Sequence, residues 1–446
     1  MVKVDFGKTA GCMKPVHGVN NGPKTRMFVF DMSAHFKDAG IPYSRLHDTE
    51  YPYGSGHFVD IPCIFPDFNA DPENPASYDF ALTDEYIKAI VAVGAKPFYR
   101  LGVSIEHAPK KYHIFPPKDF DRWAKICAGI IRHYNEGWAG GFRFGIEYWE
   151  IWNEPENPPM WQGTKEEYFR LYVTAANYLK RQFPGIKVGG YAGCGFYANT
   201  RENQSDFSKG FITYFTDFLK HITAPKTKAP LDFFSWHIYT DNIGEMAAHA
   251  VYVQKTLEEY GFGKVENILN EWNYMDAAWA ARDNGTMRSA SFVAGMFCAM
   301  QKSPVGLGTY YDAQPAMGKK FCGIFDVNGP RKPFYAFKAF NELYRLGREV
   351  ASASDLDGVH VCAASGGAQG AILLSNYEGE SRDVEVEISG MAASGGVKLD
   401  YYHLDDACDL ALKRSEVYRG DVLVPVVALP KNTVALLKLA GNLNRL

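Results

Sequence analysis

Apolar and polar positions alternate between two periods along most of the chain. Short apolar runs predict eight strands, at residues 16–20, 43–48, 95–101, 148–154, 186–191, 232–239, 267–271 and 306–312. Helical spacing between these runs predicts helices at 84–93 (capped by Thr83), 118–134, 207–222, 243–260, 287–301 and 333–346, and one after a Thr164/Glu167 capping box. The alternation predicts an α/β protein with a parallel sheet, and eight units predict a closed (β/α)8 TIM barrel.

The pattern changes near residue 348, where helical spacing stops. Short β-rich runs follow at 370–374, 384–388, 422–427 and 433–437, with Ser-Gly-Gly turns between them. They predict a small antiparallel β-sandwich domain at 348–446 after a barrel at 15–347. Residues 2–6 also alternate, so the segment 1–14 is expected to add a strand to this second domain. We expect the second domain to be a structural lid packed on the barrel.

Composition excludes several classes of function. The 446 residues carry 47 Lys and Arg against 51 Asp and Glu, and the net charge of −4 gives no reason to expect a nucleic-acid or anionic membrane partner. No apolar run is long enough to span a bilayer. Eight scattered cysteines form no CxxC or Cys/His cluster, so neither a metal nor another cofactor is predicted.

The expected compartment follows from the cysteines and the N-terminal residues. Scattered thiols favour a reducing environment, and no apolar signal segment opens the sequence. We therefore expect a cytoplasmic protein, or a periplasmic or secreted one if a signal peptide has been removed. An oligomer is compatible with the sequence, which does not decide the question.

Two of the predicted strands each deliver a glutamate. Glu154 follows Tyr-Trp-Glu-Ile-Trp-Asn, and Glu271 follows Asn-Ile-Leu-Asn. Because the carboxyl ends of barrel strands meet at one mouth, both side chains are expected there. A pair of carboxylates suits hydrolysis of a glycosidic bond, and retention of configuration needs them about 5–5.5 Å apart. Glu154 must then be protonated at rest, so we expect Glu271 and the rings of Trp149 and Trp152 to raise its pKa.

The motif Asn153-Glu154-Pro155 with a second glutamate on strand 7 resembles the retaining glycosidases built on (β/α)8 barrels. Within that superfamily, residues 148–157 with Trp161 and Gly163, the segments 45–48, 100–102 and 235–239, and the trailing β domain resemble glycoside hydrolase family 39. This family holds β-xylosidases, α-L-iduronidases and arabinose- or glucose-directed members. The residues Asn270-Glu-Trp-Asn273 instead resemble arabinofuranosidases of a sister family.

The resemblance implies roles for individual residues. Glu154 becomes the acid/base and Glu271 the nucleophile, Arg45 and Tyr239 hold the nucleophile, and Asn153 hydrogen-bonds the sugar 2-OH. Five further residues lie at or near the predicted strand ends and are candidates for substrate binding, with an ordinary core or loop role as the alternative: Asn20, His47, His237, Trp272 and Asp312.

The function predicted from these residues is a retaining exo-glycosidase that removes a terminal sugar, β-xylosyl first, from oligosaccharides. An α-L-arabinosidase or another family 39 specificity is the alternative within this class. A carbohydrate-binding barrel without catalysis is an alternative of another class. A metal-dependent barrel hydrolase would need a cluster of His and Asp ligands, which the sequence does not reveal.

Overall fold

A computed structural model describes residues 1–25, 27–50, 56–104, 111–276, 282–315, 323–391 and 396–441. Its larger part is a closed barrel of eight strands, each parallel to its neighbours. The strands are β2 (Gly18–Asn20), β5 (Tyr43–Arg45), β6 (Lys96–Leu101), β7 (Tyr148–Ile151), β8 (Lys187–Gly193), β9 (Phe233–Thr240), β10 (Glu266–Tyr274) and β11 (Leu307–Tyr310). The predicted TIM barrel is thereby confirmed.

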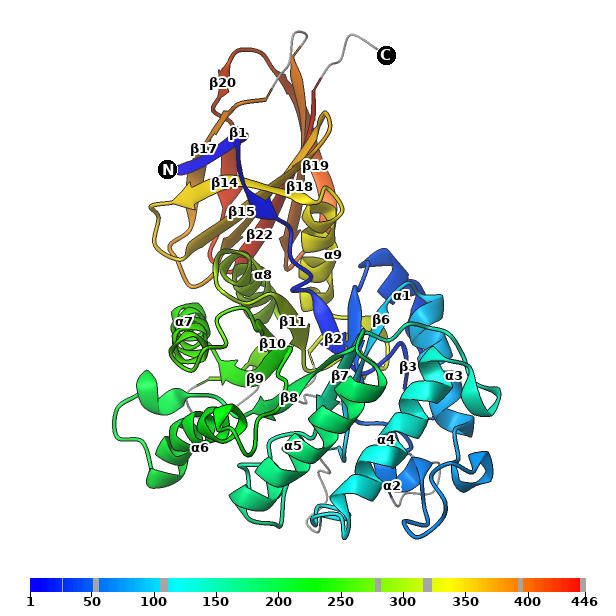
Figure 1. Ribbon diagram of the computed structural model, residues 1–446. Helices are drawn as coiled ribbons and strands as arrows, with labels where there is room; N and C mark the ends of the chain where they lie inside the picture. The colour runs from blue at the N-terminus through cyan, green and yellow to red at the C-terminus, as the bar shows by residue number, and fades with distance from the viewer. Residues whose placement is uncertain are drawn as a thin grey trace.

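Helices surround the barrel strands (Figure 1). They are α1 (Ser33–Asp38), α2 (Ile61–Ile64), α3 (Ala81–Ala92), α4 (Phe120–Asn135), α5 (Lys165–Gln182), α6 (Asp206–Thr223), α7 (Ile243–Glu259), α8 (Met287–Lys302) and α9 (Lys332–Tyr344). The predicted capping box begins α5, with Glu167 N donating to Thr164 Oγ1 over 3.1 Å. The predicted cap of α3 is wrong, because α3 already begins at Ala81 and the Thr83 hydroxyl donates to Phe58 O.

The interior of the barrel is layered. A floor of six apolar or aromatic side chains forms a cluster of its own: Tyr43, Phe98, Tyr148, Phe233, Ile268 and Leu307. Because side chains alternate along a strand, residues two positions further on face the same interior, one layer closer to the carboxyl ends. That next layer is polar and includes Arg45, Glu150 and Ser235, all with no exposed surface.

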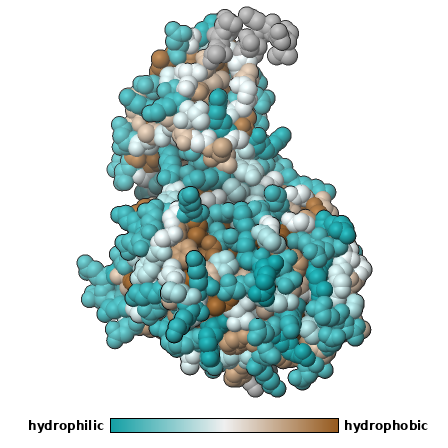
Figure 2. All heavy atoms as spheres, in the orientation of Figure 1, coloured by the Kyte–Doolittle hydropathy of each residue, from teal (hydrophilic) through white to brown (hydrophobic). Residues whose placement is uncertain are grey.

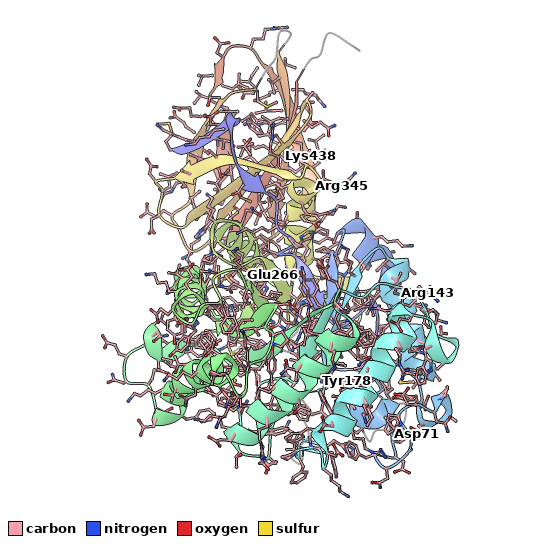
Figure 3. All side chains as sticks on the ribbon, viewed as in Figure 1. Asp71, Arg143, Tyr178, Glu266, Arg345 and Lys438 are labelled. Atoms are coloured by element: carbon pink, nitrogen blue, oxygen red, sulfur yellow. The ribbon has the colours of Figure 1, made fainter. Side chains whose placement is uncertain are left out.

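The opposite, amino-terminal end of the barrel carries charged groups outside the floor. Glu266 begins β10 (Figure 3), accepts a hydrogen bond from Tyr148 and forms an ion pair with Lys187. These contacts hold the amino-terminal ends of the strands in place, at the end of the barrel opposite the carboxyl ends.

The C-terminal part is a separate domain built on a ten-stranded, mainly antiparallel sheet (Figure 1). Its strands are β1 (Val2–Cys12), β14 (Arg348–Ser354), β15 (Val359–Gly366), β16 (Gln369–Asn376), β17 (Arg382–Ser389), β18 (Val397–Asp405), β19 (Cys408–Tyr418), β20 (Val422–Leu423), β21 (Val426–Leu429) and β22 (Thr433–Gly441). Apolar side chains from most strands of this sheet form a core distinct from that of the barrel. The strand β1 lies between β14 and β17, and the domain boundaries at residues 15 and 348 stay predictions.

Helices α8 and α9 lie between the barrel and this second domain (Figure 1). The Ser375 hydroxyl donates to Ser291 O over 2.6 Å, and Lys438 pairs with Glu342 at 2.7 Å. The face drawn in Figure 2 is mostly hydrophilic over both domains. Among the described residues, none of the helices combines the length and the apolar character that crossing a bilayer requires.

Candidate active site

Glu154 lies three residues beyond the end of β7, in a sharp turn at the mouth. Trp152 and Glu154 both have left-handed backbone conformations, with φ of +72° and +47°. Such conformations are uncommon for residues other than glycine and concentrate at functional sites. The backbone N–H of Glu154 donates to Ala192 O over 3.1 Å, which ties the turn to β8. The turn therefore aims the carboxylate inward, and Glu154 is only 7% exposed.

Glu271 lies within β10, next to a break in the regular pairing. The register between β10 and β9 shifts between Leu269 and Glu271, as at a β-bulge. Because the bulge interrupts the alternation, Asn270 and Glu271 both face the barrel interior. Asn270 reaches down to Glu150, and Glu271 reaches the mouth, where it is 2% exposed.

Two hydrogen-bond donors and two imidazole rings surround the carboxylate of Glu271. Its Oε1 atom accepts a short hydrogen bond from the Tyr239 hydroxyl. Its Oε2 atom lies 3.3 Å from Arg45 Nη1, 3.5 Å from His47 Nε2 and 3.6 Å from His237 Nε2.

His237 stands between the two glutamates. Its Nδ1 atom lies 2.8 Å from Glu154 Oε1, and its Nε2 atom faces Glu271. A carboxylate oxygen of Glu154, a ring nitrogen of His237 and a carboxylate oxygen of Glu271 all lie within 4.8 Å of one another. The two glutamates, 117 residues apart in the sequence, thus meet in a single cluster.

The pKa of Glu154 differs from the sequence-based prediction. Burial raises it, but the hydrogen bonds from His237 and Asn157 and the charge of His237 lower the pKa below its usual value. The rings expected to raise it face away from the mouth: Trp149 stacks on Tyr99 and Trp152 packs against Trp161. The pKa of Glu154 is therefore lowered where the sequence predicted a raised one, and that expectation is corrected.

Arg45 is the central cation of the site and is fully buried. It donates to Asn20 Oδ1 at 2.9 Å and to Asn153 Oδ1 at 2.6 Å, and it pairs with Glu150 at 2.7 Å. Burial would lower the pKa of Arg45, but the charges of Glu150 and Glu271 raise it. The guanidinium therefore stays charged and fixes the groups around it.

Asn153 is oriented by that arginine. Its Oδ1 atom is taken by Arg45, and its Nδ2 atom is buried without a hydrogen-bond partner in the described part of the chain. A buried amide donor left open is costly unless a ligand uses it. Asn153 therefore offers the two N–H groups of its Nδ2 atom to a bound molecule.

Of the other candidates from the sequence, His47 lies beside the nucleophile candidate, whereas Asn20 and Asp312 support neighbouring residues. His47 lies beside Glu271, with its Nδ1 atom 3.0 Å from Asp48 Oδ2. Asn20 supports Arg45 and donates to Asn270 O, so it acts from below the mouth. Asp312 follows β11 and accepts from Asn21 Nδ2 at 2.6 Å, which joins the ends of two barrel strands.

Trp272 does not belong to the site, and its expected role in substrate binding is corrected. Its ring packs edge-on against Phe297 of α8 and against Tyr310, with centroid distances of 5.8 and 5.1 Å. Side chains alternate along a strand, so Trp272 faces outward if Glu271 faces the interior. The outward position of Trp272 could therefore have been predicted from the sequence.

Sequence reasoning missed Glu150 and Cys194. Glu150 accepts hydrogen bonds from Ser235 at 2.6 Å and Asn270 at 2.5 Å besides its pair with Arg45. Its position two residues after the floor residue Tyr148 was a usable signal. The thiol of Cys194 hydrogen-bonds Glu154, and burial together with nearby carboxylates raises its pKa; no motif marks that cysteine.

The model of the family described as glycosyl hydrolases family 39 matches residues 41–281, more than half of the chain. A β-xylosidase of Geobacillus stearothermophilus is 29% identical over 219 residues, which cover 46% of this chain and 39% of that protein. A β-xylosidase of Caldicellulosiruptor saccharolyticus is 26% identical over 310 residues, or 61% and 58% of the two chains. The chain thus covers less than two thirds of the length of either relative.

Among solved structures, a glucosidase from Croceicoccus marinus superposes with a TM-score of 0.80 at 22% identity, covering 99% of this chain and 98% of the other. This likeness concerns the fold and includes both domains. The family model itself spans more than half of the chain, including the barrel segment that carries both glutamates, and the chain therefore belongs to glycosyl hydrolases family 39.

Proposed function

We propose that the protein is a retaining glycoside hydrolase that removes a terminal sugar, β-xylosyl first, from oligosaccharides through a covalent glycosyl-enzyme. Glu271 is the nucleophile and Glu154 is the acid/base. One observation carries the proposal: an oxygen of each carboxylate lies within 4.8 Å of the other in a shared buried cluster. Retaining enzymes hold the two groups about 5–5.5 Å apart, whereas inverting enzymes leave about 6.5–9.5 Å for a water.

In the first step, Glu271 attacks the anomeric carbon while the leaving oxygen takes a proton. Tyr239 and Arg45 hold the carboxylate of Glu271 in one orientation, so little reorganisation precedes the attack. The required proton comes from the carboxyl group of Glu154, whose Oε1 atom lies 2.8 Å from His237 Nδ1. Sugar binding displaces water and favours the neutral carboxylic acid.

In the second step, the charge of Glu271 has been lost to the ester bond. Glu154 then loses a negative neighbour, its carboxylate becomes the stable form, and it accepts a proton from the attacking water. The product keeps its anomeric configuration because the carbon has been inverted twice.

The choice of β-xylosyl rests on the two curated relatives, both named β-xylosidase. The open amide donor of Asn153 supports a sugar that carries a hydroxyl at C2, a group that xylosides share with glucosides and arabinosides. Arabinosyl and other family 39 specificities are separated from this proposal by the experiment below.

The test uses nitrophenyl glycosides of xylose, arabinose in both ring forms, glucose, galactose and glucuronic acid. We expect turnover of the β-xyloside first, and a product whose NMR spectrum shows the β-anomer before mutarotation. Glu271→Gln should abolish turnover of every glycoside. Glu154→Gln should keep more activity on a dinitrophenyl than on an alkyl leaving group, because only the latter needs a proton.

Glu147→Gln is the matched control, since Glu147 precedes β7 at the opposite end of the barrel and should leave turnover unchanged. Initial formation of the α-anomer would reject the retaining mechanism. Binding of oligosaccharide without turnover of any glycoside would favour the carbohydrate-binding barrel.

A further inference from the structure

The three groups at the centre of the site match the donors of a transition-metal site. Glu154 lies in the turn after β7, His237 lies on β9 and Glu271 on β10, and none of the three is more than 7% exposed. His237 Nε2 makes no hydrogen bond within the described part of the chain and faces Glu271 Oε2 at 3.6 Å. One imidazole and two carboxylates are a donor set that Zn²⁺ uses in sites with an open position.

The charge around this cluster is negative. Glu150, Glu154, Glu271 and Asp48 bring four carboxylates to the described part of the site, and Arg45 is the permanent cation that faces them. His47 and His237 add positive charge only when they are protonated. An excess of buried carboxylates attracts a divalent cation.

Each of these three groups is already oriented by a neighbour. Asn157 Nδ2 donates to Glu154 Oε2 at 3.1 Å, and the Tyr239 hydroxyl donates to Glu271 Oε1. The contact between His237 Nδ1 and Glu154 Oε1 fixes the imidazole ring. Support of this kind around ligands raises metal affinity, because less order has to be created on binding.

We propose that one Zn²⁺ binds between Glu154, His237 and Glu271, with His237 Nε2 as its nitrogen ligand, and that it inhibits the enzyme. A bound ion takes up both carboxylates and occupies the place of the anomeric carbon, so it excludes the sugar. The imidazole donor favours Zn²⁺ over Mg²⁺ and Ca²⁺, which prefer sites made of oxygen ligands. The ion is therefore an inhibitor of the site and has no part in the reaction.

The test measures binding without turnover. Metal-stripped protein is titrated calorimetrically with ZnCl₂ in a buffer that does not chelate, and we expect one ion per chain. His237→Gln and Glu271→Gln should each weaken binding about tenfold or more. His113→Gln, which removes an exposed histidine outside the cluster, is the matched control and should bind as the unmodified protein does.

Thermal unfolding of each variant shows whether it is folded. If His237→Gln does not fold, Glu271→Gln still tests the site. Where a glycoside is turned over, Zn²⁺ should inhibit competitively, Mg²⁺ should not inhibit, and EDTA should restore the rate. Unchanged zinc affinity in both variants would overturn the site, as would the absence of binding. Loss of turnover on removing metal with EDTA would overturn the inhibitory role. Calorimetry decides the metal site even if no glycoside is cleaved.

Discussion

Arg45 and Glu150 form an ion pair of 2.7 Å in which neither side chain has any exposed surface. The pair lies one layer below the mouth, and the remaining donors of Arg45 reach Asn153 and Glu271. Glu150 thus determines where the guanidinium sits, and through it the position of two residues that meet the sugar. A carboxylate that contacts no substrate in the proposed mechanism therefore shapes the site.

Replacing Glu150 by Gln should lower both stability and turnover. The change leaves a buried guanidinium without its main counter-charge, and breaking a buried pair in this way costs about 3–5 kcal/mol. Arg45 should also move toward Glu271, which would slow the attack on the sugar. Urea unfolding measures the first effect, and kcat/KM on the nitrophenyl glycoside measures the second.

The control for this prediction is Asp38→Asn, which removes a surface partner of Lys338 at 2.9 Å. An exposed pair of this kind contributes about 0–1 kcal/mol. Equal losses in the free energy of unfolding for the two variants would show that the buried ion pair stabilises the fold no more than an exposed pair does.

Asn153→Ala should weaken transition-state binding at the 2-OH of the sugar. A hydrogen bond to that hydroxyl strengthens as positive charge develops on the ring, so kcat/KM should fall by about a hundredfold or more. A 2-deoxy glycoside separates this effect from misfolding, because the variant and the unmodified enzyme should cleave it at similar rates. A hundredfold difference on the 2-deoxy glycoside as well would assign Asn153 to the support of Arg45 alone.

The barrel was predictable because strand and helix periods are local properties of the sequence. The contact between Arg45 and Glu150 was not, since the two residues are 105 positions apart and meet only when the barrel closes. The carboxylates at 154 and 271 were found because each ends an apolar run. The bulge that turns Asn270 and Glu271 to the same side leaves no comparable pattern in the sequence.

The lowered pKa of Glu154 has a similar origin. The sequence places His237 on the sixth barrel strand, but the 2.8 Å contact of its Nδ1 atom depends on the left-handed turn at Glu154. Trp272, by contrast, could have been assigned correctly, because strict alternation after an inward Glu271 turns its ring toward α8. Local periodicity thus predicts which side of a strand a side chain faces. Which residue it contacts there depends on the tertiary structure.

Tyr197→Phe should slow catalysis through Tyr239. The Tyr197 hydroxyl accepts from Tyr239 N at 2.7 Å, and the Tyr239 side chain in turn holds Glu271. The change also removes the hydrogen bond that the Tyr197 hydroxyl donates to Tyr239 O at 3.2 Å. Loss of the two bonds, at about 1 kcal/mol each, corresponds to a kcat lower by about thirtyfold at most, with KM changed less because Tyr197 has no place among the proposed sugar contacts. Steady-state kinetics on the nitrophenyl glycoside gives both constants.

Tyr178→Phe is the matched control, because Tyr178 lies half-buried on α5 (Figure 3) with its ring under Arg181 and should leave both constants unchanged. A rise in KM at constant kcat in Tyr197→Phe would show that Tyr197 acts on sugar binding and does not position Tyr239.

Glu156→Gln should make the stability of the protein less dependent on pH. Burial, followed by the charge of Glu154, raises the pKa of Glu156 from 4.5 to about 8, while its Oε1 atom accepts from Cys194 N. Between these two values the folded chain holds a proton that the unfolded chain has released. The free energy of unfolding therefore falls as pH rises through this window, by up to about 1.4 kcal/mol per pH unit, and levels off above about pH 8.

Gln keeps the shape and the hydrogen-bond acceptor of Glu156 but cannot ionise, so this loss should disappear from the variant. Urea unfolding at pH 5, 6, 7 and 8 should give a flatter profile for Glu156→Gln and the largest gain over the unmodified protein at the alkaline end. Glu166→Gln, at an exposed carboxylate in the first turn of α5, should leave the profile as it is. Parallel profiles for all three proteins would mean that Glu156 is already ionised in the folded chain, and that the buried end of the β7 loop carries one more negative charge beside Glu154.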